Sequence, residues 1–164
     1  NENSLPKTDE RIYSIFNKEF IDNPVSEEKN LLVFENNLSF ETTEFKNKNF
    51  KKIFLVLNDN ETRKIKLSEK VLNFKKFLTY DQDKRLKQKS INCEIINIEE
   101  LKNINEDIYA LYPSVGENLD YINSINLKNI KFLYRKIDKY SWKFCNKGFF
   151  NFKNYIPKIV QEFI

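Results

Sequence analysis

The stretch IFLVLNDN (residues 53–60) decides the fold class of this chain. Five consecutive apolar residues, 53–57, are followed by the turn-forming triplet Asn58, Asp59 and Asn60. Short continuous apolar runs that end at a turn are typical of strands covered on both faces, as in parallel sheets. Residues 53–57 are therefore predicted to form a buried central strand.

Four further segments are predicted to be strands, and helical patterns separate several of them. The strand segments are residues 31–34, 91–98, 108–111 and 130–134. Helical spacing is seen in residues 8–21, at Leu67, Val71, Phe74 and Leu78, at Leu119, Ile122 and Ile125, and in residues 155–163. Short apolar strands that alternate with helices predict an α/β fold. We expect a Rossmann-like, doubly wound sheet of about five mainly parallel strands, with helices on both faces.

The domain organisation is predicted to be simple. The chain has 164 residues, which is close to the usual size of one domain. It contains no internal repeat and no linker-like segment. We expect one domain over residues 1–164, with an N-terminal helix and loop in 1–29 and the α/β core in 30–164.

The composition argues against several classes of function. There is no His, and the two Cys stand far apart, so neither an ordinary zinc site nor a His-based catalytic group is predicted. Two Gly are too few for a P-loop or a dinucleotide-binding fingerprint. No apolar run reaches the length of a membrane span. We expect no catalytic residue, no metal and no membrane contact, and a cytoplasmic protein with reduced thiols.

The turn at residues 112–120 is the first candidate site. It follows a predicted strand and begins a helix, at the edge where doubly wound sheets bind ligands. Ser114 and Glu117 have the spacing of a capping box, and the helix N–H groups could hold an anion. A well-formed strand-to-helix turn explains the same residues. The candidate ligand-binding residues are Tyr112, Ser114, Val115 and Gly116.

The aromatic and basic segment at residues 142–157 is the second candidate site. Its density of aromatic residues suits a docking surface for another domain, a stacking surface for single-stranded nucleic acid, or plain core. If it is a docking surface, some of its aromatic side chains should be exposed. The candidate partner-docking residues are Trp142, Lys147, Phe149, Phe150, Phe152 and Lys153.

The two segments together resemble the end of the N-terminal α/β domain of the photolyase/cryptochrome family. The resemblance lies in a Tyr-Pro-x-Val-Gly turn at Tyr112, followed by a strand, a Trp, and the motif KGFFNFKNYIP (residues 147–157). It implies an α/β domain that holds an antenna chromophore such as a folate or a deazaflavin, next to a separate helical domain that binds FAD. The Arg-rich opening strand of many family members is absent here, which puts antenna binding and repair activity in doubt.

Three functions follow as hypotheses. The first is a photolyase-related domain, not catalytic by itself, that binds a chromophore or a partner, either an FAD-binding helical domain or a second chain. The second is a small nucleic-acid-binding or mobile-element protein of an AT-rich genome, suggested by the net charge of +4 and the Lys-rich aromatic segment. Such binding should be weak and electrostatic. The third is a fragment of a nucleotide- or nucleotide-sugar-handling enzyme.

Overall fold

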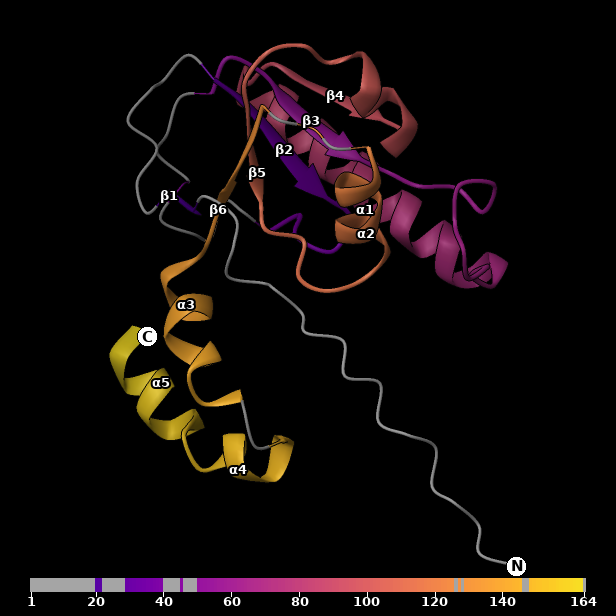
Figure 1. Ribbon diagram of the computed structural model, residues 1–164. Helices are drawn as coiled ribbons and strands as arrows, with labels where there is room; N and C mark the ends of the chain where they lie inside the picture. Colours follow the sequence, from indigo (N-terminus) through magenta and orange to yellow (C-terminus); the bar gives the residue numbers. More distant parts are fainter. Residues whose placement is uncertain are drawn as a thin grey trace, which may run out of the picture.

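The computed structural model describes residues 20–21, 29–39, 45, 50–125, 127, 129–145 and 148–163. All its strands run parallel in one sheet (Figure 1). The strands are β1 (Phe20–Ile21), β2 (Asn30–Phe34), β3 (Ile53–Val56), β4 (Cys93–Ile96), β5 (Ile108–Leu111) and β6 (Ile130–Leu133), in the spatial order β1-β6-β5-β2-β3-β4. The five predicted strands are thus confirmed as β2–β6. The two-residue strand β1, which was not predicted, lies at the edge of the sheet beside β6.

Strands β2 and β3 are buried because they have strands on both sides and helices or loops on both faces. In the register of the pair, Leu31 lies opposite Ile53 and Phe34 lies opposite Val56. Residues of β2 and β3 are almost fully buried along their whole length. The prediction of a central strand at residues 53–57 is confirmed.

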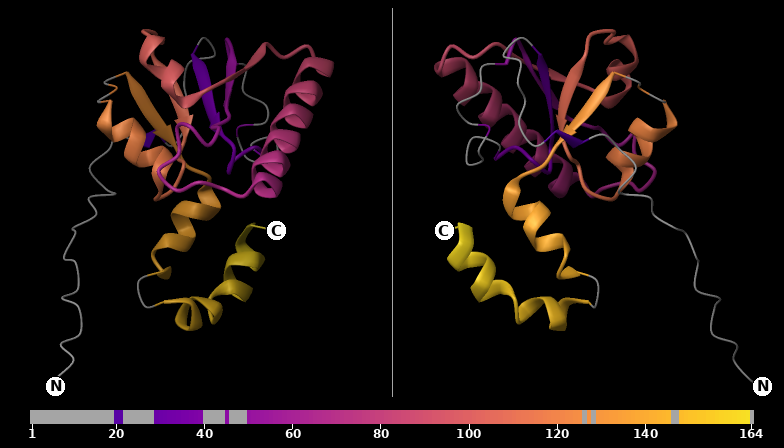
Figure 2. Two further views of the ribbon diagram at one scale, coloured as in Figure 1. Left: turned by 90° about the vertical axis from the view of Figure 1, so that its right-hand side faces the viewer. Right: turned by 60° about the vertical axis from the view of Figure 1, so that its left-hand side comes forward.

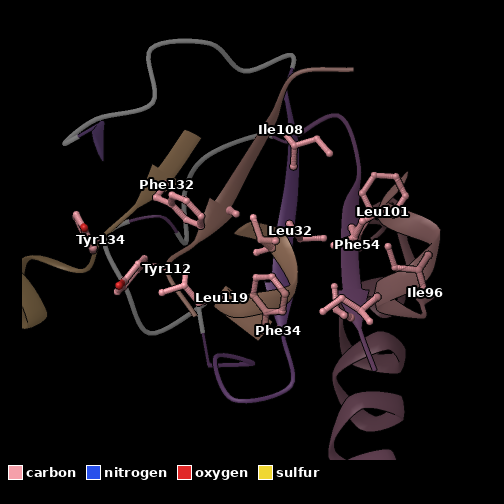
Figure 3. Close-up of a cluster of buried hydrophobic side chains, with 14 residues drawn as sticks. Leu32, Phe34, Phe54, Ile96, Leu101, Ile108, Tyr112, Leu119, Phe132 and Tyr134 are labelled. Carbon is pink, nitrogen blue, oxygen red and sulfur yellow. The ribbon is translucent and has the colours of Figure 1, made fainter. Parts of the chain in front are cut away.

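Alternate side chains of the strands enter two separate cores. One core contains Leu32, Phe34, Phe54 and Val56 and is covered by helix α2 (Glu117–Ser124) and a 3₁₀ helix (Ile98–Asn103) (Figure 3). The opposite core is covered in part by helix α1 (Glu69–Gln88), which contributes Leu86. Figure 2 shows α1 and α2 on opposite sides of the sheet. The doubly wound, Rossmann-like arrangement is therefore confirmed.

Helix α1 departs from the expected orientation. Ser68 is its N-cap, and the helix buries Thr79, Gln82 and Leu86. The apolar stripe predicted to face the core is exposed instead at Val71, Phe74 and Leu78. The buried stripe lies about a quarter turn around the helix from the apolar one, since successive residues are 100° apart. Long polar side chains can fill a buried position when their polar ends find partners, so hydrophobic periodicity alone gave the wrong face.

The chain after β6 forms a helical arm, residues 136–163, beyond the carboxyl edge of the sheet (Figures 1 and 2). It consists of α3 (Lys136–Trp142), α4 (Phe149–Lys153) and α5 (Ile156–Phe163). Helix α3 packs on α5, with the Tyr140 and Phe163 ring centroids 5.3 Å apart. Gly148 begins α4 with φ of 80°, a conformation that L-residues rarely adopt. The sequence predicted α5 but neither α3 nor α4.

The N-terminal part of the chain is described only at β1. The predicted helix over residues 8–21 lies outside the described residues up to residue 19. Its last two residues, Phe20 and Ile21, are strand and pair with Phe132 and Leu133. In the described part of the chain, no helix has the length and apolar character needed to cross a membrane.

Candidate functional site at the carboxyl edge of the sheet

The carboxyl edge of the sheet has a topological switch point between β2 and β5. From β2 the chain proceeds to β3 and β4 on one side, then returns to β5 and β6 on the other. The loops after β2 and β5 therefore leave the sheet in opposite directions. In open α/β sheets this is the place where ligands usually bind.

A buried group of charged residues joins the loops around the switch point. Arg63, in the loop after β3, donates from Nη2 to both carboxylate oxygens of Glu35 at 2.5 and 2.6 Å. Its other terminal nitrogen, Nη1, donates to Glu117 at the start of α2. Lys75 of α1 makes a third ion pair, in which its Nζ lies 2.8 Å from Glu35 Oε1. The side chains of Arg63 and Glu35 are each only 4% exposed, so this cluster fixes the positions of four chain segments.

Two asparagines connect the loop after β2 to the loop after β5 at the switch point. Asn36 donates its side-chain amide to the carbonyl oxygen of Pro113 at 2.9 Å, and Asn37 donates to that of Tyr112 at 2.8 Å. The small cavity beside them, lined in part by Asn37, Tyr112 and Arg135, has a volume of about 10 Å³. That is room for about one water molecule.

The turn predicted to bind a ligand has a different construction from the one expected. Gly116, with φ of 140°, is the N-cap of α2 and no side chain caps the helix, so the predicted capping box of Ser114 and Glu117 is wrong. The side chain of Glu117 instead contacts Arg63. Ser114 adopts φ of 63° and is exposed, as are Val115 and Gly116, whereas Tyr112 is buried.

The N-terminus of α2 is also unsuited to an anion. Glu117 and Asp120 lie in its first turn, where their negative charges already complement the helix dipole. A phosphate there would face two carboxylates. The anion-binding interpretation of the turn therefore finds no support in the geometry.

A second cavity, of about 130 Å³, lies on the α2 side of the same edge. It is bounded by the loop after β3, the 3₁₀ helix and α2. Asn58 and Asn118 hold two of these segments together, because Asn58 Nδ2 donates to Asn118 Oδ1 at 2.9 Å. The lining residues are Asn58, Thr62, Lys64, Ile98, Glu117, Asp120, Tyr121 and Ser124.

Sequence reasoning missed both the charged cluster and this cavity. The sequence does carry a signal for two of these residues. Glu35 directly follows β2 and Asn58 comes two residues after β3, and β2 and β3 are the most deeply buried strands. Arg63 and Glu117 gave no signal, because their pairing depends on a loop conformation that no sequence pattern fixes.

The predicted docking segment divides into a packed part and an exposed part. Trp142 is half-buried against Tyr112 and Tyr134, with ring centroids 5.7 and 4.6 Å apart. Phe149 and Phe150 are 67% and 85% exposed. Phe152 is half-buried and Lys153 is exposed, while Lys147 lies outside the described residues.

Within the described part of the chain, the side chains with nucleophilic or metal-binding chemistry form no recognisable catalytic group. Burial raises the pKa of the Cys93 thiol to about 11, and the thiol donates to Asp83 Oδ1 at 3.2 Å, so it is protonated at neutral pH. Among the residues that the structure describes, no three His, Cys, Asp or Glu side chains gather in a way that could hold a metal ion.

Comparison with known proteins returns no relative. No protein-family model, no curated protein and no solved structure matches the chain.

Proposed function

We propose that this chain is an α/β domain of the photolyase/cryptochrome type, not catalytic by itself, that docks an FAD-binding helical domain through its C-terminal arm. The observation that carries the proposal is the exposure of the adjacent Phe149 and Phe150 at the start of α4. Large apolar side chains grouped on a surface often mark a protein interface. In the family that the chain resembles, the α/β domain works together with a separate helical domain that binds FAD.

The attachment of the arm supports a docking role. Trp142 anchors α3 to the aromatic residues that follow β5 and β6, so the arm begins from a fixed point on the sheet. The aromatic pairs Tyr140–Phe163 and Phe144–Tyr155 then hold its helices together. Phe149 and Phe150 are thus presented by a folded structure rather than by a free tail, which lowers the entropy cost of binding.

The geometry supports docking of a partner better than it supports binding of an antenna chromophore at the predicted turn. Ligand cavities for such molecules measure about 300 Å³ or more. The cavity that Tyr112 borders measures about 10 Å³, and Asn37, which also lines it, donates to the Tyr112 carbonyl oxygen. We therefore assign the turn to fold stability and the arm to function.

The proposal is tested by mixing this chain with an FAD-loaded helical domain of the photolyase type and measuring the affinity by calorimetry. The double substitution Phe149→Ala/Phe150→Ala is expected to weaken binding about a hundredfold or more. The reason is that each Phe contributes about 1.5–3 kcal/mol when it is buried at an interface. Phe77→Ala is the matched control, because Phe77 is 70% exposed on α1, outside the arm. It should change the affinity less than twofold.

Three results would contradict the proposal. The first is the absence of a complex at about 1 mM of each partner, the effective concentration at which a short linker holds two joined domains. The second is equal binding by the double variant and the unaltered chain. The third is self-association of the chain that Phe149→Ala/Phe150→Ala abolishes, since the exposed pair would then serve a second copy.

Single-stranded nucleic acid is the second candidate ligand of the arm, and the distribution of charge favours it. Residues 136–164 contain six Lys, one Asp and one Glu, a net charge of +4 that equals the net charge of the whole chain. Exposed aromatic rings among lysines are typical of surfaces on which bases stack. The rest of the chain is neutral overall, so this charge is concentrated on the arm.

The second candidate predicts weak and salt-sensitive binding. A labelled single-stranded DNA oligonucleotide should bind at about 50 mM salt and lose about a hundredfold or more of its affinity at about 200 mM, because phosphate contacts release counterions. Fluorescence anisotropy measures both values. Sequence-selective binding that persists at high salt would contradict this expectation, and no binding at low salt would remove nucleic acid as a ligand.

A further inference from the structure

We propose that the exposed apolar side of the first half of α1 binds an acidic amphipathic helix of a partner protein. This surface, which we call the α1 stripe, consists of Val71, Phe74, Phe77 and Leu78. Figure 1 shows α1 and the helical arm at separate places on the molecule. The inference therefore does not rest on the proposed docking function of the arm.

Helix α1 is much longer than the neighbouring strands. It has 20 residues, whereas β3 and β4 have four each. At about 1.5 Å per helical residue and about 3.3 Å per strand residue, the helix measures about 30 Å and the strands about 13 Å. The buried side chains of α1, Thr79, Gln82 and Leu86, all belong to its second half. The first half extends beyond the end of β3 (Figure 1), so the sheet cannot cover all of its apolar side chains.

The α1 stripe exposes a large amount of apolar surface. Its four side chains are between 38% and 70% exposed, and the two Phe are the most exposed of them. Since a phenylalanine side chain has roughly 200 Å² of surface, the two rings alone expose roughly 250 Å². The whole stripe thus reaches the size of the largest apolar patch on a typical monomer, roughly 300–600 Å². Patches of this size often mark an interface.

The spacing of the stripe suits a second helix. Val71, Phe74 and Leu78 stand three and four residues apart, which is the spacing with which apolar side chains pack against another helix in a coiled coil. Beyond the first turn of α1, its backbone groups are bonded within the helix, so the stripe offers side chains. A partner strand would find no backbone groups to pair with there, whereas a helix satisfies its own backbone internally.

Positive charge borders the stripe on the side away from the sheet. Lys70 and Lys84 lie seven residues before and after Phe77, which places all three close to one line along the helix. Both lysines are exposed. The nearby carboxylate of Asp81 is paired with Arg85, whose Nε lies 3.6 Å away. The border of the stripe is therefore net positive.

This charge favours an acidic helix over a second copy of the chain as the occupant. Glutamates beside the apolar row of a partner helix would pair with Lys70 and Lys84. In a dimer of this chain, the lysines of both copies would be brought together and would repel. Lys64 and Lys66, exposed in the loop just before α1, would add to that repulsion.

The probe is a dye-labelled peptide of three heptads with Leu at positions a and d, Glu at e and g, and Ala elsewhere. The glutamates also keep the peptide from pairing with itself. Titrated with the full chain and followed by fluorescence anisotropy, it is expected to bind with a Kd of about 10 μM, an affinity suited to a small interface. The same peptide with Lys in place of Glu should bind about tenfold more weakly or worse, because it meets Lys70 and Lys84 with like charges.

The apolar contact is tested by Phe74→Ala/Phe77→Ala. Burial of two largely exposed rings contributes about thirtyfold or more to the affinity, and this variant should lose that contribution. Phe149→Ala/Phe150→Ala, the same double change at two exposed rings of the arm, is the matched control and should alter the affinity less than twofold. All four positions are exposed, so both variants should keep the fold, which thermal unfolding by circular dichroism checks.

The charge contact is tested by Lys70→Glu/Lys84→Glu. This variant should bind the Glu peptide about tenfold more weakly or worse, and the Lys peptide more tightly than the unaltered chain does. Such a reversal of preference cannot arise from a loss of folding. Lys153→Glu/Lys158→Glu, the same change at exposed lysines of the arm, is the matched control and should keep the original preference.

Several results would overturn the proposal. No binding of the Glu peptide at about 100 μM would show that the stripe and its lysines hold no acidic helix, since a Kd of about 10 μM predicts near saturation there. Equal affinity for the two peptides would show that charge is not recognised, and full binding by Phe74→Ala/Phe77→Ala would place the peptide elsewhere. Self-association of the chain that Phe74→Ala/Phe77→Ala abolishes would assign the stripe to a second copy.

Discussion

Replacing Val56 by Asp is expected to unfold the domain at room temperature. Val56 is fully buried in β3, where its side chain enters the core shared with Phe34 and Phe54. An unpaired carboxylate at this position costs about 5 kcal/mol or more, since an ionised group loses its hydration and packing is lost as well. Domains of this size are stable by only about 5–15 kcal/mol.

Circular dichroism during thermal unfolding measures this effect directly. The Val56→Asp variant should show no cooperative transition, or one that is lower by tens of degrees. Val115→Asp is the control, because Val115 is 63% exposed at the turn before α2 and the same substitution there should change the melting temperature little. A Val56→Asp variant as stable as the unaltered chain would mean that β3 is not a central strand.

Removing the guanidinium of Arg63 is expected to give the second-largest loss of folding stability. The Arg63→Ala variant leaves Glu35 buried with only Lys75 as a charged partner and also removes the contact with Glu117. Breaking a buried ion pair on one side costs about 3–5 kcal/mol. Because Lys75 remains, a loss of about 3 kcal/mol is expected, which urea denaturation resolves as a lower midpoint with an unchanged slope.

Two further variants distinguish the effect of burying an ion pair from the effect of losing a charge. Arg135→Ala breaks the half-exposed pair of Arg135 with Asp138 at the start of α3 and should cost less than about 1 kcal/mol. Adding Glu35→Gln to Arg63→Ala removes the uncompensated carboxylate and should recover about 1–2 kcal/mol. Equal losses for Arg63→Ala and Arg135→Ala would show that the cluster around Arg63 adds no more than a surface pair.

Strands β2, β3 and β5 were predictable from the sequence because their burial on both faces leaves an apolar run that little else produces. Residues 53–57 and 108–111 were located in this way to within one residue. The orientation of α1 was not predictable, since Thr79 and Gln82 are buried while Phe74 is exposed. Periodicity assumes that apolar side chains face inward, and it fails where polar side chains find buried partners.

The candidate sites were predictable only in part. Exposed aromatic side chains in residues 142–157 were expected only if the segment is a docking surface, and Phe149 and Phe150 are indeed exposed while Trp142 and Phe152 are half-buried. The capping box was wrong, since Glu117 gains more from the buried Arg63 than from a backbone N–H at the helix end. The cavity beside Asn58 depends on three segments that are distant in sequence, and no local pattern encodes their meeting.

The central position of β2 also affects how the chain folds during synthesis. Leu31 pairs with Ile53 on one side but with Tyr109 on the other. At translation speeds of about 5–20 residues per second, β5 leaves the ribosome roughly 4–16 s after β2. Throughout that interval the side of β2 that pairs with β5 has no partner strand, and four of the five residues of β2 are apolar. Such edges favour aggregation, so chaperones that cover nascent chains are most important for this protein before residue 111 emerges.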